Sequence, residues 1–151
     1  MIAQLTGSLL RIEDDSTVID VNGVGFRVAI PNAEMFSSHQ IGDMVTLYTY
    51  LHVRENALSL YGFQTDEEKE LFQVLIGVSG VGPKLALTML SSLPMDTLRT
   101  AITTQRSDLL EVVPGIGRKT AQRILFDLHD KADLAAAIHL RESVSDVEQE
   151  V

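Results

Sequence analysis

The sequence contains no cysteine, which excludes a disulfide framework and a thiolate metal site. No uninterrupted apolar run approaches the roughly 20 residues that a membrane-spanning helix requires. The amino terminus has neither the basic segment nor the apolar segment of a secretory signal. Together these absences predict a soluble, cytoplasmic protein that has no membrane partner.

Side chains arranged for catalysis are also lacking. The four histidines have no metal-ligand spacing, and no serine or threonine has an obvious base partner. The acidic pair Asp14–Asp15 and the acids at 66–68 are typical of solvated turns and helix starts. The sequence therefore predicts no catalytic residue, no metal site and no cofactor.

Positive charge is scarce, because the net charge is −9. This value argues against a general nucleic-acid-binding surface, but the distribution is uneven. Residues 64–131 hold eight basic and nine acidic side chains, whereas residues 1–63 hold three and seven, and residues 132–151 hold one and five. The middle segment is thus nearly neutral, and its basic side chains gather near two glycine-rich motifs. These side chains are Lys84, Arg118, Lys119 and Arg123.

The two motifs are copies of one pattern, 35 residues apart. Residues 78–86 read Val-Ser-Gly-Val-Gly-Pro-Lys-Leu-Ala, and residues 113–121 read Val-Pro-Gly-Ile-Gly-Arg-Lys-Thr-Ala. The register continues outward through Leu75 with Leu110 and Leu90 with Leu125. A repeat of this kind predicts a duplicated structural unit, here a glycine hairpin that opens a helix.

Such a hairpin suits a phosphate group. Glycine permits a positive-φ turn and removes the side chain that would keep a ligand away from the backbone. The first amides of the following helix have no intrahelical partner and lie at the positive end of the helix dipole. Lys84 and Lys119 lie where a side chain adds charge to that site. Two such sites related by a pseudo-two-fold axis would contact both backbones across a minor groove, with little base preference.

Other interpretations of the motifs are weaker. A single Gly-x-Gly before a helix is often only a tight turn, but here two copies match in register and each carries a lysine. A dinucleotide-binding fingerprint requires a preceding strand, whereas the residues before each motif have helical spacing. A P-loop is excluded because Arg118 separates Gly117 from Lys119 and the upstream glycine is too close. No nucleotide hydrolysis is predicted.

Residues 1–63 have the pattern of short β-strands separated by turns. Asn22-Gly23 is a strong hairpin signal, and a second turn is expected near residues 54–56. Five strands in about 60 residues predict a small OB-like barrel, with a single sheet packed on the second domain as the alternative. The expected strands are 2–12, 17–21, 25–30, 44–53 and 57–63.

Residues 64–131 have helical spacing. Thr65 followed by Glu68 is a capping-box start, and Pro83 occupies a first-turn position. Further helices are expected at 83–92, 95–104, 107–112 and 118–130. The fold class is therefore α+β: a barrel domain over 1–63, a tandem helix–hairpin–helix domain over 64–131, and an acidic tail or start of a flexible linker over 132–151.

With these motifs in place, the chain resembles the RuvA family, the bacterial Holliday-junction-binding subunits of the branch-migration machinery. The resemblance covers about residues 1–131 and is highly specific in combination. The segments that carry it are Met1-Ile2, Gly7, residues 52–63 with their Leu-Tyr-Gly-Phe ending, residues 80–86 and residues 114–121.

The resemblance implies a non-enzymatic homotetramer that holds a four-way DNA junction open and nearly square, with an octamer on DNA left open. It implies a role in recombination, DNA repair and the SOS response, as an accessory subunit of an ATP-dependent helicase complex. Partners would be the hexameric RuvB motor and the RuvC resolvase. Phosphate contacts would involve Gly80, Val81, Gly82, Lys84, Gly115, Ile116, Gly117, Arg118, Lys119, Thr120 and Arg123. A pin at the junction centre would comprise Arg54, Glu55 and Asn56.

The sequence departs from the family in two ways. The pin usually carries two adjacent acids, but the second position here is Asn56, which predicts weaker repulsion at the junction centre. The family also has a third, motor-docking domain after a flexible linker, and this chain ends where that linker would begin. As written, the chain is expected to bind junctions without recruiting the motor.

Two other functions remain open from the residues alone. A general tandem helix–hairpin–helix module of a repair nuclease would bind junction and linear duplex alike. A hairpin-containing glycosylase or nuclease would need a catalytic lysine or acid cluster facing the DNA, and none can be placed in this sequence.

Overall fold

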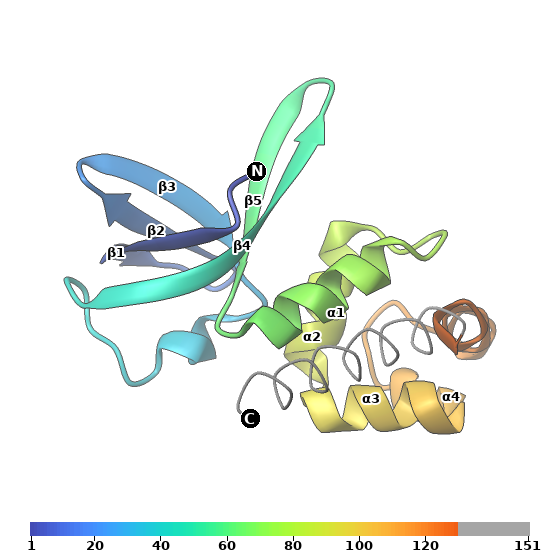
Figure 1. Cartoon of the computed structure of the whole chain (residues 1–151). Helices are drawn as coiled ribbons and strands as arrows, with labels where there is room; N and C mark the ends of the chain where they lie inside the picture. Colours follow the sequence, from blue (N-terminus) through green and yellow to red (C-terminus); the bar gives the residue numbers. More distant parts are fainter. Residues whose placement is uncertain (130–151) are drawn as a thin grey trace, which may run out of the picture.

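The computed structural model describes residues 1–129, in which a β-barrel is followed by a group of helices (Figure 1). Five strands close the barrel in the order β1-β2-β3-β5-β4. All neighbours pair antiparallel except β3 and β5, which pair parallel. The OB-like prediction is confirmed, and the single-sheet alternative is wrong. The strands are β1 (Gln4–Ile12), β2 (Ser16–Val21), β3 (Val24–Ala29), β4 (Met44–Arg54) and β5 (Ala57–Phe63).

The barrel interior is filled by alternate residues of its strands, because successive side chains point to opposite faces. Leu5 and Leu9 of β1 pack with Ile19, Val28 and Leu47 in this core. Between the two leucines, β1 carries a glycine, Gly7. A Cβ at this position would collide with the backbone carbonyl oxygen of Asp20 on β2. The close approach of β1 and β2 therefore requires glycine at this position.

The turn between β2 and β3 forms at the predicted Asn-Gly pair. Asn22 and Gly23 have φ of 52° and 91°, the left-handed values of a type I′ turn. The Asp20 carboxylate accepts a hydrogen bond of 2.7 Å from the Gly23 amide. This local geometry explains why the position of the turn could be predicted from the sequence.

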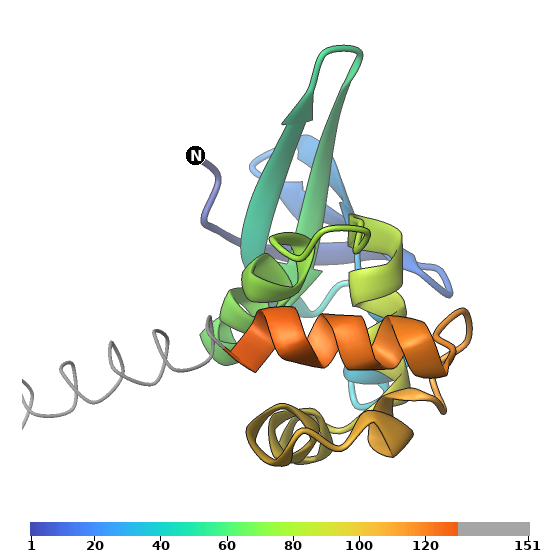
Figure 2. The same ribbon diagram turned by 90° about the vertical axis from the view of Figure 1, so that its right-hand side faces the viewer.

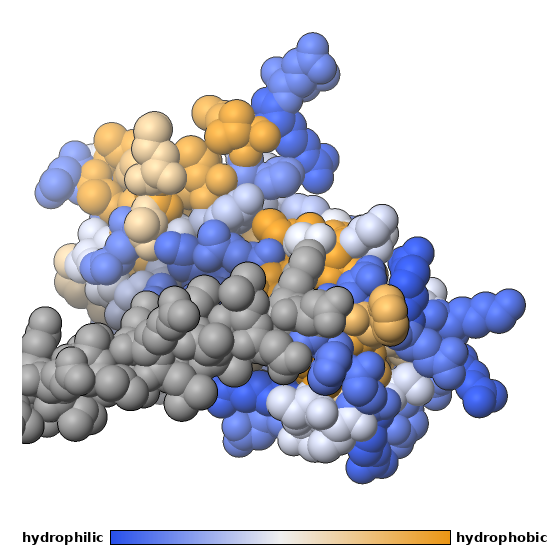
Figure 3. Space-filling model, turned by 45° about the vertical axis from the view of Figure 1, so that its right-hand side comes forward, coloured by the Kyte–Doolittle hydropathy of each residue, from blue (hydrophilic) through white to orange (hydrophobic). Residues whose placement is uncertain are grey.

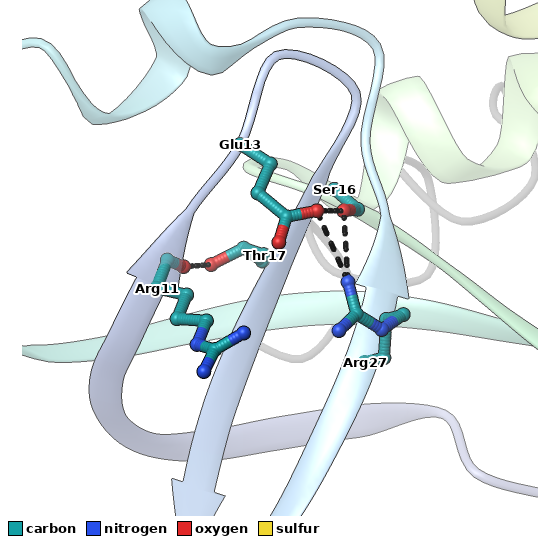
Figure 4. Close-up of polar contacts among 5 residues, drawn as sticks. All are labelled: Arg11, Glu13, Ser16, Thr17 and Arg27. Atoms are coloured by element: carbon teal, nitrogen blue, oxygen red, sulfur yellow. Dashed lines mark hydrogen bonds and ion pairs between the residues drawn. The ribbon is translucent and has the colours of Figure 1, made fainter.

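A polar cluster closes the other end of β2 (Figure 4). The Glu13 carboxylate accepts hydrogen bonds from the Ser16 hydroxyl at 2.8 Å and from Arg27 at 3.1 Å. The Ser16 hydrogen bond and the Arg27 charge hold the pKa of Glu13 below its ordinary value. The buried Thr17 hydroxyl donates to the Arg11 carbonyl at 2.6 Å. Arg27 therefore neutralises an acid of the barrel itself.

The helices begin where the sequence predicted. Thr65 accepts a 3.2 Å hydrogen bond from the Glu68 amide at the start of α1, and its hydroxyl donates to the Glu68 carboxylate. Burial raises the pKa of Glu68 above its ordinary value. The helices are α1 (Asp66–Ile76), α2 (Pro83–Ser92), α3 (Met95–Thr104) and α4 (Ser107–Leu110), and residues 118–129 are also helical.

The prediction for 107–112 was too long, because α4 ends at Leu110. There the Val113 amide turns back to donate to the Leu110 carbonyl at 3.1 Å, which starts the second hairpin. Residues 111–112 have helical spacing in the sequence, but they form this turn because the second hairpin begins here. No helix in the described part of the chain is long and apolar enough to cross a membrane.

The helices enclose a second hydrophobic core, and Phe63 at the end of β5 belongs to it. The Phe63 ring lies 5.0 Å from that of Phe72 on α1, between ring centroids. Tyr61 and Tyr50 also contact Phe72, at 5.1 and 5.8 Å. These aromatic contacts fix the β4–β5 hairpin against α1. The division between residues 63 and 64 stays a prediction, and the predicted tail over 132–151 lies outside the described residues.

Candidate nucleic-acid interface

The duplicated motif forms two hairpins with the same backbone. Gly80 and Gly115 have φ of +85° and +90°, a region that favours glycine. Three pairs of backbone hydrogen bonds recur in register, all between 2.9 and 3.1 Å. In the first hairpin, the amides of Val78, Val81 and Ala86 donate to the carbonyls of Leu75, Val78 and Gly82, respectively. In the second hairpin, the amides of Val113, Ile116 and Ala121 donate to the carbonyls of Leu110, Val113 and Gly117.

The middle residue of each hairpin holds it to the core. The side chains of Val81 and Ile116 are buried, with 4% and 5% of their surface exposed. These residues were predicted to bind DNA, and the structure leaves only their backbone available for this role. Burial of the middle side chain is the reason that each Gly-x-Gly turn has a defined orientation.

The second glycine of each hairpin has a different property. Gly82 has φ −89° and ψ 175°, which any residue adopts, and it is the N-cap of α2 without a side-chain hydrogen bond. A Cβ at Gly82 or Gly117 would meet nothing within 4 Å. Neither protein packing nor a positive φ therefore requires glycine at these positions. The bare backbone leaves room for an external group beside the unpaired helix amides.

The basic side chains near the hairpins have no acidic partner among residues 1–129. Elsewhere, Arg27 pairs with Glu13 at 3.1 Å, Arg106 pairs with Asp108 at 2.7 Å, and Arg99 pairs with Glu67. The Arg106 hydrogen bond holds the pKa of Asp108 below its ordinary value. Within residues 1–129, no ion pair is formed by the exposed cations of the hairpins, which are Lys84, Arg118, Lys119 and Arg123.

The two hairpins differ in how their cations are supplied. Arg123 lies on the helix that follows the second hairpin, yet its guanidinium covers Gly80 of the first. Thr120 is half-buried, whereas Arg118 and Lys119 are exposed. The predicted phosphate-contacting residues thus lie at the two hairpins. The sequence repeat did not predict that Arg123 contacts the first hairpin and not the second.

The predicted pin is the tip of the β4–β5 hairpin, which projects from the barrel beyond the other strands (Figure 1). Arg54, Glu55 and Asn56 are all exposed. Below this tip, Val53 and Leu58 face each other in register and are 66% and 72% exposed. Figure 3 shows the hydrophilic tip with hydrophobic surface beside and below it.

A cleft of about 570 Å³ connects the pin with the first hairpin. Tyr50, His52 and Arg54 line it from β4, and Gly82 and Pro83 line it from the start of α2. Tyr50 and His52 were not predicted as site residues, although the period of two along β4 places both on the face of Arg54. Among residues 1–129, no three His, Asp or Glu side chains are grouped closely enough to hold a metal ion.

Two family models match the chain. The RuvA N terminal domain matches residues 1–62, and the SAM-like helix-hairpin-helix tandem matches residues 72–130. The first match covers the barrel with its projecting hairpin. The second covers both glycine hairpins.

Several curated relatives bear the name Holliday junction branch migration complex subunit RuvA. That of Geobacter metallireducens is 49% identical over 131 residues, covering 87% of this chain and 66% of the relative. That of Herpetosiphon aurantiacus is 44% identical over 135 residues, covering 89% and 68%. That of Methylibium petroleiphilum is 46% identical over 140 residues, covering 91% and 73%. The chain thus spans about two thirds of the length of these relatives, and it belongs to the RuvA family.

Proposed function

We propose that the chain is a DNA-binding scaffold that grips the sugar–phosphate backbone of a four-way junction. The observation that carries this proposal is the pair of hairpins with open backbone at Gly82 and Gly117. Beside them lie four cations that form no ion pair within the part of the chain that the structure describes. Amides at a helix start bind phosphate oxygens without reading the base sequence. The binding is therefore non-specific in sequence and sensitive to salt.

The projecting pin supplies the preference for a branched substrate. Glu55 at its tip repels phosphates at the point where strands cross, whereas the hairpins attract the arms further out. Phe72 holds the β4–β5 hairpin through three ring contacts, which supports a fixed position of the pin relative to the hairpins. The acid at the centre and the cations at the periphery together favour an open junction over a continuous duplex.

The proposal includes assembly into a homotetramer. One chain of net charge −9 offers few phosphate contacts, and several copies on one DNA raise the effective concentration of each. Exposed apolar residues of the barrel supply surface for contact between copies. They are Leu10, Val24, Ile41, Met44, Val53 and Leu58.

As a member of a branch migration complex, the scaffold would present the junction to partners and perform no bond cleavage itself. The relatives' name, subunit of a branch migration complex, supports this role. The motor would be the ATP-driven RuvB hexamer, RuvC would resolve the junction, and the setting would be the cytoplasm.

Direct binding tests the proposed function. Fluorescence anisotropy would compare a labelled four-way junction with a linear duplex of equal arm sequence, over a range of salt concentrations. We expect at least tenfold tighter junction binding at moderate salt, and a log-log salt slope that reflects several phosphate contacts. Equal affinity for the two DNAs would contradict the proposal and favour a general helix–hairpin–helix module.

The pin gives a separate prediction. Asn56→Asp places a second acid on each pin and should raise the ratio of junction to duplex affinity several-fold, because repulsion at the crossing point increases. Asn56→Ser is the matched control, since it alters the same exposed position without charge and should leave the ratio unchanged. If Asn56→Asp also leaves the ratio unchanged, the repulsive role of the pin is wrong.

A further inference from the structure

The first hairpin is contacted by a cation that belongs to the other repeat. A Cβ at Gly80 would lie 2.5 Å from Nη2 and 3.3 Å from Cζ of Arg123. The equivalent Cβ at Gly115 would meet nothing within 4 Å. Figure 2 shows the 118–129 helix running past the connection between α1 and α2, which contains Gly80. The two hairpins therefore share a backbone geometry but differ in what lies against it.

The two repeats also differ in where they carry cations. At the first helical position the first repeat has Pro83, which offers neither a charge nor an amide hydrogen, and the second has Arg118. Five positions later the first repeat has Thr88 and the second has Arg123. The Thr88 hydroxyl donates to the Lys84 carbonyl of its own helix at 2.9 Å. Thus the cation that the first repeat lacks locally is delivered by the second.

We propose that Arg123 is a phosphate-binding residue of the first hairpin and not of its own. This inference rests on the proposed DNA-binding function and assigns one residue within it. The first phosphate site would then hold Lys84 and Arg123, and the second would hold Lys119 and Arg118. Each site has two cations, and the planar guanidinium of Arg123 is suited to two parallel hydrogen bonds with a phosphate.

Double-mutant cycles on junction binding test this assignment. Arg123→Gln should weaken binding about tenfold and reduce the salt slope by about one for each bound subunit, as expected for loss of one phosphate contact per subunit. Because Arg123 and Lys84 would hold the same phosphate, Arg123→Gln with Lys84→Gln should deviate from additivity by at least about threefold. Arg123→Gln with Lys119→Gln should be additive. The reverse pattern, coupling to Lys119 and additivity with Lys84, would overturn the assignment.

A second measurement needs no DNA. In amide NMR spectra of the free protein, Arg123→Gln should shift the Gly80 resonance and leave the Gly115 resonance in place. In the junction-binding assay, Arg123→Lys keeps the charge but loses the planar guanidinium. Its affinity should therefore lie between that of Arg123→Gln and that of the wild-type chain. If the wild-type chain does not prefer junctions, the proposed function fails while the NMR comparison still decides where Arg123 lies. An unshifted Gly80 resonance would overturn the inference even if junction binding is confirmed.

Discussion

Replacing Gly82 and Gly117 together by aspartate should stabilise the fold and abolish junction binding. Gly82 already has the extended N-cap conformation, and a Cβ at either position meets nothing within 4 Å. An aspartate there would accept hydrogen bonds from the free amides of the first turn and interact favourably with the helix dipole. We expect a gain of about 0.5–1 kcal/mol in the free energy of unfolding.

The same carboxylates would occupy the amides that the phosphates need and would repel the DNA. We expect junction affinity to fall at least 100-fold, with thermal unfolding and anisotropy measured on one sample. Gly82→Asn with Gly117→Asn is the matched control, because asparagine caps the helix equally well without a charge. The junction affinity of this asparagine variant should lie between that of the wild-type chain and that of the aspartate variant. Full junction affinity in the aspartate variant would show that the helix starts do not contact DNA.

Gly7→Ala should destabilise the barrel strongly. The added Cβ collides with the Asp20 carbonyl oxygen and would lie 2.8 Å from Cγ2 of Ile19. Because the Asp20 oxygen belongs to the backbone, it cannot rotate away as a side chain could. Strands β1 and β2 must therefore move apart, which disturbs the core residues on either side of Gly7. We expect a loss of about 3 kcal/mol, at the upper end of the usual range for overpacking. The measurement is denaturant unfolding followed by circular dichroism.

Gly25→Ala on β3 is the control for this change. Its Cβ would lie 3.4 Å from Cγ1 of Val18, which is an ordinary contact. The free energy of unfolding should change by no more than about 0.5 kcal/mol. If Gly7→Ala is as stable as Gly25→Ala, the close approach of the two strands is not a constraint on the fold.

Much of the site was predictable because its determinants are local. The positive φ of Gly80 and Gly115 and the start of α2 at Pro83 follow from a few neighbouring residues. The Asn22-Gly23 turn is local in the same sense. The duplication strengthened each prediction, since one interpretation had to fit two copies.

Features that depend on packing between distant segments were not predictable. The side chain of Arg123 reaches Gly80 because of the way in which the 118–129 helix passes the first hairpin, and no pattern in either repeat encodes that crossing. Phe63 ends a strand of the barrel but packs in the helical core, so the alternation of β5 did not reveal its neighbours. The early end of α4 at Leu110 likewise reflects a hairpin that follows it.

The aromatic contacts that hold the β4–β5 hairpin against α1 also set the distance between the tip of this hairpin and the helical core. Strand β5 runs for seven residues from beside the pin to Phe63, with no intervening linker. At about 3.3 Å per residue, the separation between the tip and the helical core is set at roughly 20 Å by strand geometry. Under the proposed function, a branch point at the pin and the duplex flanking it would have to match this reach simultaneously. The chain would then select its substrate by length as well as by charge.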